Sequence, residues 1–239
     1  MSIPLVVLAI GLAMLLVERV VRARPWPAMQ GWWPRAILFN VVQAGAALLA
    51  GLTWDRFMID HRPFTLESLS LVTQAILGYL AITLIYYWWH RWRHEVPFLW
   101  RWLHQLHHSP RRIELITSFY KHPLEILING VLSSTIVYWV VGVEPVAAAL
   151  AVTLTGIAEL FYHWNVSTPH WLGYLIQRPE SHCVHHQEGL HHYNYADLPV
   201  WDMLFGTFRN PRAWNESCGF GGDVERLKLR DMLLGRSVT

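Results

Sequence analysis

The stretch that decides the fold is residues 71–89, LVTQAILGYLAITLIYYWW, which continues directly into His90-Arg-Trp-Arg-His94. A helix of this length and apolar character can cross a hydrocarbon core of roughly 30 Å. Residues four apart share a helix face, so both histidines point the same way if the helix continues. A span that ends in paired imidazoles predicts a membrane protein with metal chemistry near the membrane surface.

The composition of the 239 residues supports this interpretation. Charged residues make up 15% of the chain, against roughly 25% in a soluble domain, and apolar residues make up 53%. A formal net charge of +2 argues against a disordered tail or a nucleic-acid binder. Two cysteines are too few for an all-cysteine zinc site or a cysteine-ligated iron–sulfur cluster, whereas histidine and tryptophan each occur 14 times.

Four more apolar stretches flank the first one and are also long enough to cross a membrane. They are residues 3–21, 34–54, 124–143 and 145–162. The chain is therefore predicted to be an all-α integral membrane protein with four to five transmembrane helices. We expect residues 1–239 to form one domain, with a helical cap that carries the histidines.

The charges of the connecting segments predict the orientation, because cytosolic loops carry an excess of Lys and Arg. Arginines follow the apolar stretch at residues 3–21, and the segment 55–70 has a net charge of −1. The loop that follows residues 71–89 holds two acids and six basic residues: Arg91, Arg93, Arg101, Arg111, Arg112 and Lys121. We expect an outside N-terminus, cytosolic His-box regions at 90–123 and 163–210, and a cytosolic tail at 211–239. The expected membrane is a bacterial inner membrane, or the endoplasmic reticulum in a eukaryote.

Two further histidine clusters follow the first pair. They read His104-Gln-Leu-His107-His108 and His182-Cys-Val-His185-His186, so each can present three imidazoles on one helix face. Eight imidazoles exceed the needs of one ion, since zinc takes four ligands and iron commonly six. Two ions are the simpler inference. Imidazole suits iron, copper and zinc alike, so the ligand type leaves the metal open.

The C-terminal half contains motifs that carry a family resemblance. They read Leu160-Phe-Tyr-His163-Trp-Asn165-Val, Arg178-Pro-Glu-Ser-His182, Asn194-Tyr-Ala and Trp201-Asp202-Met-Leu-Phe205-Gly-Thr207-Phe. Together with the boxes, residues 90–208 resemble the sterol desaturase / fatty acid hydroxylase superfamily of membrane di-iron oxygenases, in its bacterial type. The resemblance implies two iron ions, O2 as co-substrate, and His163 as a ninth ligand beside the eight box histidines. Zinc can take the place of iron in a purified sample.

Several other polar residues are candidates for supporting roles. Glu159 lies one helical turn before His163, and we expect it to accept a hydrogen bond from a ligating imidazole. Asn165, Asn194 and Asp202 are also expected to support ligating histidines. His192 is a reserve ligand close to the third box.

The expected reaction is O2-dependent hydroxylation or desaturation of an unactivated C–H position. A site at the ends of apolar helices favours a membrane lipid: a sterol- or hopanoid-like ring system, a fatty acyl chain or an alkyl lipid. The chain has no dinucleotide fingerprint or cysteine cluster motif, so electrons must come from an external donor. A ferredoxin, a rubredoxin or a cytochrome b5-like protein with its reductase is expected, and the basic segment 91–121 is a candidate surface for steering it.

Three other functions stay open at this point. A zinc-dependent membrane hydrolase normally needs a glutamate base, as in His-Glu-x-x-His, but His94-Glu95 is followed by Val96-Pro97. A non-enzymatic metal or haem carrier places its histidines within spans rather than beyond their ends. A transporter would need broken-helix repeats, which the five short spans do not show.

Overall fold

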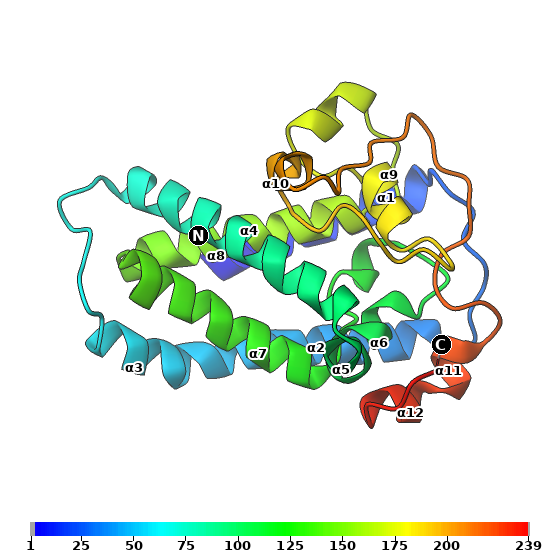
Figure 1. Cartoon of the computed structure of the whole chain (residues 1–239), viewed down its shortest axis with the longest axis horizontal. Coiled ribbons are helices and arrows are strands. Elements are labelled where there is room, and N and C mark those ends of the chain that lie inside the picture. The colour runs from blue at the N-terminus through cyan, green and yellow to red at the C-terminus, as the bar shows by residue number, and fades with distance from the viewer. Residues whose placement is uncertain (1–2, 239) are drawn as a thin grey trace.

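The computed structural model describes residues 3–238, with side chains from residue 6 onward. Within this range the chain is helical, and its one extended pairing is an isolated bridge between Gln187 and Cys218. Figure 1 shows an elongated bundle of long helices with short helices and loops gathered at one end. The long elements are α1 (Ile3–Val20), α2 (Trp32–Leu52), α3 (Trp54–Asp60), α4 (Leu71–Glu95), α7 (Pro123–Ser134), η3 (Thr135–Val141) and α8 (Pro145–His163). The short ones are α5 (Pro97–Leu99), η1 (Trp100–His104), α6 (Gln105–His108), η2 (Leu115–Thr117), η4 (His170–Tyr174), α9 (Pro179–His185), α10 (Pro199–Leu204), α11 (Val224–Leu227) and α12 (Leu229–Leu233).

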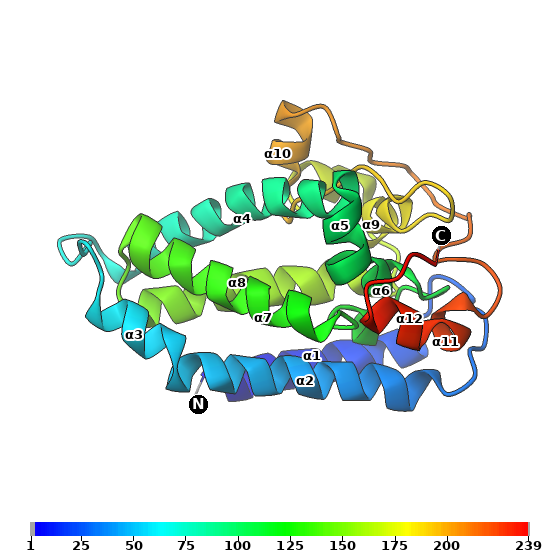
Figure 2. The same cartoon turned by 60° about the horizontal axis from the view of Figure 1, so that its bottom comes forward.

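The long helices fit a membrane. Four helical segments of the described chain are long and apolar enough to cross one: Trp32–Asp60, Leu71–Glu95, Pro123–Val141 and Pro145–His163. Helix α1 is a fifth apolar helix beside them (Figure 2). The outer face of α2 exposes Leu38, Val41 and Leu48 at 59%, 61% and 72%, as expected of side chains that face lipid. The chain is an all-α integral membrane protein, as predicted.

Local sequence signals set the helix ends. The Ser70 hydroxyl accepts a hydrogen bond from the Thr73 amide at the start of α4. Helix α4 ends at Glu95 because Val96 precedes Pro97, and a residue before proline avoids helical geometry. Gly142 ends η3 in the left-handed conformation, with φ of 74°, so that Pro145 can begin α8 directly afterwards.

Helices α4 and α8 form the centre of the bundle. A Cβ atom on Gly78 of α4 would lie 3.2 Å from the Cβ of Ala151 on α8, so glycine allows this close approach. Around this contact, Ile82, Val137 and Ala147 belong to a buried apolar cluster. The packed pair forms a rigid scaffold for the ends of both helices.

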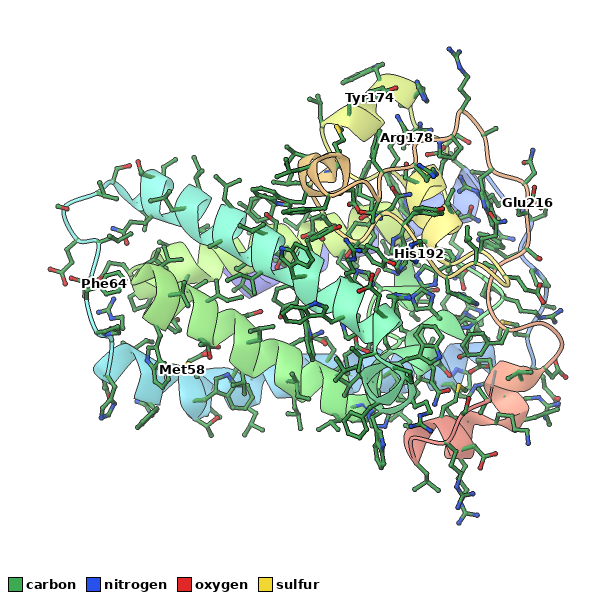
Figure 3. The ribbon with its side chains drawn as sticks, viewed as in Figure 1. Met58, Phe64, Tyr174, Arg178, His192 and Glu216 are labelled. Carbon is green, nitrogen blue, oxygen red and sulfur yellow. The ribbon has the colours of Figure 1, made fainter. Side chains whose placement is uncertain are left out.

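Helix α4 extends beyond the predicted span. The predicted span ends at residue 89, whereas the helix continues through both histidines of the first box to Glu95. Helices α4 and α8 finish at the same end of the bundle, which we call the histidine end. His192 and Arg178 lie toward this end, and Met58 and Phe64 lie at the opposite one (Figure 3). The short helices cover the histidine end, so a helical cap is present as expected.

Candidate metal centre

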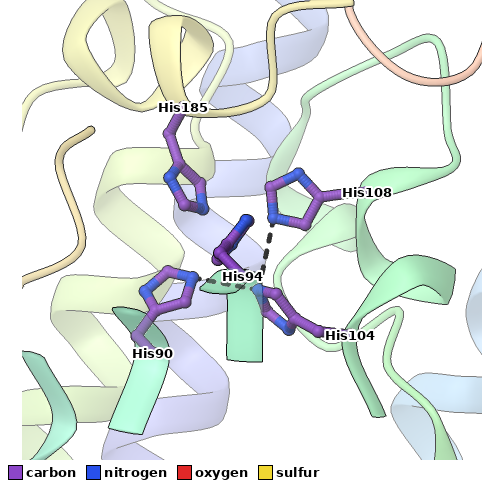
Figure 4. A group of neighbouring side chains, drawn as sticks. All are labelled: His90, His94, His104, His108 and His185. Atoms are coloured by element: carbon purple, nitrogen blue, oxygen red, sulfur yellow. Dashed lines mark hydrogen bonds between the residues drawn. The ribbon is translucent and has the colours of Figure 1, made fainter. Parts of the chain in front are cut away.

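The structure brings all nine candidate histidines together at the histidine end. They form two groups, and within each group the candidate ligand atoms lie within 4.8 Å of one another. Group A, which Figure 4 shows, consists of His90, His94, His104, His108 and His185. Group B consists of His107, His163, His182 and His186.

Each group combines residues that are distant in sequence. His90 and His94 come from the last two turns of α4, while His104 ends η1. The adjacent pair His107 and His108 on α6 divides between the groups. Helix α9 does the same, because it gives His182 to group B and His185 to group A. His163 is the last residue of α8, and His186 follows α9 directly.

The two groups touch each other. The rings of His108 in group A and His186 in group B are stacked, with centroids 4.1 Å apart and an interplanar angle of 14°. His182 of group B also stacks on His185 of group A, with centroids 5.2 Å apart. The histidine end therefore holds one continuous cluster of imidazoles with two centres.

Contacts between ring nitrogens match the spacing of ligands around a single ion. In group A, His104 Nε2 lies 2.9 Å from His90 Nε2 and 3.2 Å from His108 Nε2 (Figure 4). In group B, His182 Nε2 lies 3.0 Å from His163 Nε2 and 3.1 Å from His186 Nε2. Ligands about 2.0–2.1 Å from a metal are separated by similar distances at tetrahedral or octahedral angles.

Backbone carbonyls determine which ring nitrogen is free. The Nδ1–H of His90 donates to Tyr195 O at 2.8 Å, and that of His185 donates to Tyr193 O at 2.7 Å. His163 Nδ1–H donates to Glu159 O at 2.9 Å. A neutral imidazole that donates from Nδ1 keeps an unprotonated Nε2, and this arrangement is typical of metal-binding histidines.

The same reasoning applies to His104 and reveals a conflict that a cation resolves. His104 Nδ1 lies 3.0 Å from Glu125 Oε1 and 3.1 Å from Arg93 Nη1, and in the tautomer that donates to the carboxylate its Nε2 is unprotonated. Its Nε2 then faces the unprotonated Nε2 of His90 at 2.9 Å. Two lone pairs at this distance repel unless a cation lies between them. The donor set therefore fits metal ions.

Ring nitrogens without hydrogen-bond partners also indicate that the two groups suit metal ions. His94 Nε2, His185 Nε2 and His186 Nδ1 are buried and have no hydrogen-bond partner within residues 3–238. Buried polar atoms of this kind are costly unless they bind something. Two of the three atoms belong to group A.

Burial keeps the imidazoles neutral. Desolvation, with help from neighbouring charges, lowers the pKa of His108 and His186 well below its ordinary value. It lowers the pKa of His185 to about 3. A neutral imidazole is the form that binds a metal, so the rings are ready to do so at neutral pH.

Glu125 and its partner Arg93 also support the site, a role that local sequence did not indicate. Glu125 is fully buried in the first turn of α7 and forms an ion pair with Arg93 of α4. The carboxylate thereby holds His104 in place. An acid two residues after the Pro123 that begins an apolar helix was the available signal. Gln177, whose side-chain nitrogen lies 3.0 Å from His182 Nδ1, is another residue of this kind.

The predicted supporting residues have different positions from those expected. The backbone oxygen of Glu159 contacts His163, whereas its carboxylate forms an ion pair with Lys121. The Asn165 side chain binds the backbone of Arg24 instead of a histidine. These two side chains therefore do not hold a ligand directly.

Asn194 and Asp202 act through a loop. Asp202 accepts hydrogen bonds from the amides of Tyr195 and Ala196 at 2.8 and 3.0 Å. The Asn194 side chain donates to Ser181 O at 2.8 Å. Both residues therefore hold the loop whose carbonyls orient His90 and His185.

The reserve ligand His192 lies outside both groups. Its Nδ1 is 2.7 Å from the Tyr195 hydroxyl. Its neighbour His191 contacts group A, with Nδ1 3.1 Å from His108 Nδ1.

The basic segment 91–121 differs from the steering surface expected. Arg93 and Lys121 are only 4% and 8% exposed, and each is paired with a glutamate. Arg91 and Arg112 are also paired, with Glu95 and Glu114. Four of the six basic residues are thus paired with glutamates, and two of these four are buried.

A cavity of about 630 Å³ leads from the histidines into the bundle. Its metal-side wall contains five of the nine rings: His90, His104, His107, His163 and His182. Next to them lie the polar side chains of Arg93, Lys121, Glu159, Tyr162 and Asp197. The rest of the lining includes small apolar side chains, among them Ala46, Ala47, Ala50, Ile82, Val137, Ala148 and Val152, and also polar ones such as Gln43, Asp55, Asn129, Ser133 and Ser134. The cavity suits a molecule with a long apolar part and a polar end.

Comparisons with known proteins find relatives that are named as monooxygenases and hydroxylases. The chain is 31% identical to alkylglycerol monooxygenase of Homo sapiens over 174 residues, which are 70% of this chain and 36% of that protein. It is 30% identical to the ornithine lipid hydroxylase OlsE of Rhizobium tropici, covering 70% of this chain and 51% of that protein. It is 24% identical to sphinganine C4-monooxygenase 1 of Arabidopsis thaliana, covering 71% and 66%.

The chain thus spans between about a third and two thirds of the length of these relatives. No solved structure matches it significantly. The sequence model of the fatty acid hydroxylase family matches residues 75–207, which include most of α4, all of α8 and all nine histidines. This match covers more than half of the chain, which therefore belongs to the fatty acid hydroxylase family.

Proposed function

We propose that the nine histidines bind two iron ions, one in group A and one in group B, and that the protein oxidises a membrane lipid. The observation that carries the proposal is the pair of adjacent all-imidazole groups at the end of a lipid-sized cavity. Bound iron would supply the reduction of O2 and the removal of hydrogen from an unactivated C–H bond. Zinc is expected to occupy the same ligands in iron-poor preparations.

The protein's own residues orient the ligands and position the substrate. The carbonyls of Tyr193 and Tyr195, together with Glu125, hold protons on Nδ1 atoms and keep the facing Nε2 atoms free. The apolar wall excludes water and aligns the alkyl chain. These roles require only preformed geometry, because the surrounding helices and loop already hold the rings.

We infer that the substrate carries a polar group close to the carbon that reacts. Lys121, Glu159 and Asp197 line the cavity beside the histidines, while the rest of the lining includes small apolar side chains. A headgroup bound by these side chains would place the first few carbons of its chain at the metals. The names of the relatives agree, since an alkylglycerol, an ornithine lipid and sphinganine each join a polar group to a long chain. An alkyl lipid therefore fits better than a sterol-like ring system.

Electrons are proposed to come from a separate donor of the ferredoxin, rubredoxin or cytochrome b5 class. Because these donors are soluble or exposed at the membrane surface, the histidine end is proposed to face the cytosol. We also propose that residues 1–239 act as a single domain, with the tail after residue 210 on the same side. A reporter fused after Thr239 should be active only in the cytosol, and activity on the outer side would contradict this orientation.

Comparative lipid mass spectrometry tests the function. Cells that express the wild-type protein should contain a lipid heavier by one oxygen atom than its counterpart in cells without the gene. His185→Ala should abolish the product, whereas His61→Ala should leave it unchanged, because His61 is an exposed residue outside both groups. Identical lipid profiles in all strains would contradict the proposal.

A further inference from the structure

A second cavity lies outside the metal centre and contains an unusual number of arginines. It has a volume of about 190 Å³ and lies where the C-terminal end of α1 meets the segment before η2. Its arginines are Arg19, Arg22, Arg24 and Arg112. The proposed lipid oxidation does not use this cavity.

Arg24 has donors that are buried and unpartnered. The residue is 9% exposed, and its Nη2 lies 3.6 Å from Glu180 Oε1. Its Nε and Nη1 have no hydrogen-bond partner in the described part of the chain, and neither does the nearby Trp26 Nε1. An arginine has five N–H donors, and leaving buried ones unpaired is costly. Three unpaired donors on two lining residues point to a bound acceptor.

The backbone around Arg24 is held rigidly. Asn165 Oδ1 accepts from the Arg24 amide at 3.0 Å, and Asn165 Nδ2 donates to the Arg24 carbonyl at 2.9 Å. Glu18 Oε1 in turn accepts from the amides of Asn165 and Leu115, both at 2.8 Å. Arg24 is therefore preorganised, and ligand binding would cost little ordering of the chain.

The charge balance of the cavity favours an anion. Of its two acids, Glu114 is already neutralised by Arg112 at 2.7 Å and accepts from Trp32 Nε1 at 2.6 Å. Arg19 stacks over the Trp33 ring at 4.0 Å and keeps its positive charge. The second acid, Glu18, leaves Oε2 unpartnered within residues 3–238. The cavity thus offers several donors and one free acceptor.

We propose that this cavity binds the phosphate group of an anionic phospholipid, with phosphatidylglycerol as the best-fitting headgroup. Arginine donors match phosphate oxygens, and a glycerol hydroxyl would donate to Glu18 Oε2. The volume far exceeds the roughly 30 Å³ share of one water molecule. Basic pockets at the ends of membrane helices are suited to anionic lipids. Soluble phosphate esters have the same chemistry, so the test must separate the two sources.

The test measures the thermal stability of the delipidated full chain in detergent as ligand is added. Phosphatidylglycerol should raise Tm in a saturable manner, and phosphatidylcholine should not, because its headgroup carries a net zero charge and no hydroxyl. Glycerol 3-phosphate is the soluble probe. A shift with this probe and none with phosphatidylglycerol would overturn the lipid assignment, and equal shifts with both phospholipids would overturn the anion site.

Variants link the shift to the cavity. Arg24→Gln should weaken phosphatidylglycerol binding at least tenfold, since it removes a charged donor group. Arg56→Gln, at an exposed arginine of α3, is the matched control and should bind normally. Trp26→Phe keeps an aromatic ring and removes the N–H donor with the rest of the five-membered ring, so it is the second test if Arg24→Gln fails to fold. The proposal would be contradicted if Trp26→Phe bound phosphatidylglycerol with wild-type affinity. It would also be contradicted if Arg24→Gln and Arg56→Gln bound it equally well.

Discussion

The two histidine groups use the same ligand chemistry on different supports. In group A, His90 and His185 depend on carbonyls of the loop at residues 193–195, and His104 depends on the buried Glu125–Arg93 pair. In group B, His163 is held by the last turn of its own helix. Group B is also buried throughout, whereas His90 and His94 of group A are partly exposed.

This difference has an energetic origin. Tyr193 and Asn194 have φ angles of 68° and 50°, in the left-handed region that is unfavourable for residues other than glycine. The loop is kept there by Asp202 and the Asn194 side chain. His90 and His185 of group A therefore depend on irregular, strained structure, whereas His163 of group B is held within a regular helix. Changes to supporting residues should affect group A first.

The largest expected effect comes from removing a ligand in either group. His185→Ala in group A and His107→Ala in group B should each abolish turnover and lower the iron content from two ions per chain to about one. Both variants should remain in the membrane, because the bundle packs without these rings. Iron analysis and membrane fractionation test this, and full activity in either variant would remove that histidine from the site.

Glu125→Gln should lower the iron affinity of group A and leave that of group B unchanged. It removes the carboxylate that holds His104 and leaves Arg93 buried without its partner, so iron affinity should fall 10- to 100-fold in group A. Group B should keep its ion. Glu144→Gln is the matched control, since it breaks a partly exposed pair with Arg62. Iron titration of both variants checks this. An equal loss of iron affinity in both groups would contradict the claim that Glu125 supports group A alone.

Asn194→Ala should have a smaller effect on stability. Alanine keeps the strained φ and loses the hydrogen bonds to Ser181 O and from the Arg209 amide. We expect a loss of about 1–3 kcal/mol in the free energy of unfolding, with weaker iron binding in group A. Asn194→Gly should recover the part due to strain. Thermal denaturation measures both, and no recovery with glycine would show that the loop stores no backbone strain.

The last expected effect is a pH dependence from Asp197. Burial, together with nearby Glu159, raises the pKa of Asp197 to about 7 from 3.8. Between these values the folded protein binds more protons than the unfolded chain, so stability should fall as pH rises from about 4 to 7. Asp197→Asn should flatten this dependence. Melting temperatures across the range test it, and identical slopes for both proteins would contradict the role of burial.

Most of the fold could be predicted from the sequence, because a membrane helix appears in it as a long apolar stretch. All five apolar stretches are helices, with boundaries that differ by a few residues. The sequence placed His90 and His94 on one helix face beyond the predicted span, and α4 does continue through them to Glu95, where Val96 precedes Pro97.

The site was partly predictable for a different reason. Histidine spacing on helix faces indicated which rings gather, but spacing does not show how rings divide between two centres. His107 and His108 are neighbours in sequence and belong to different groups. Supporting contacts such as Glu125 to His104 join separate helices, so they depend on tertiary packing that local pattern does not encode.

The most direct test of the central claim is the metal content of the intact protein, purified from iron-supplied cells without chelators. Two adjacent imidazole groups predict about two iron ions per chain, and Glu125→Gln should retain about one at limiting iron. A value of one or zero in the wild-type protein would contradict the account.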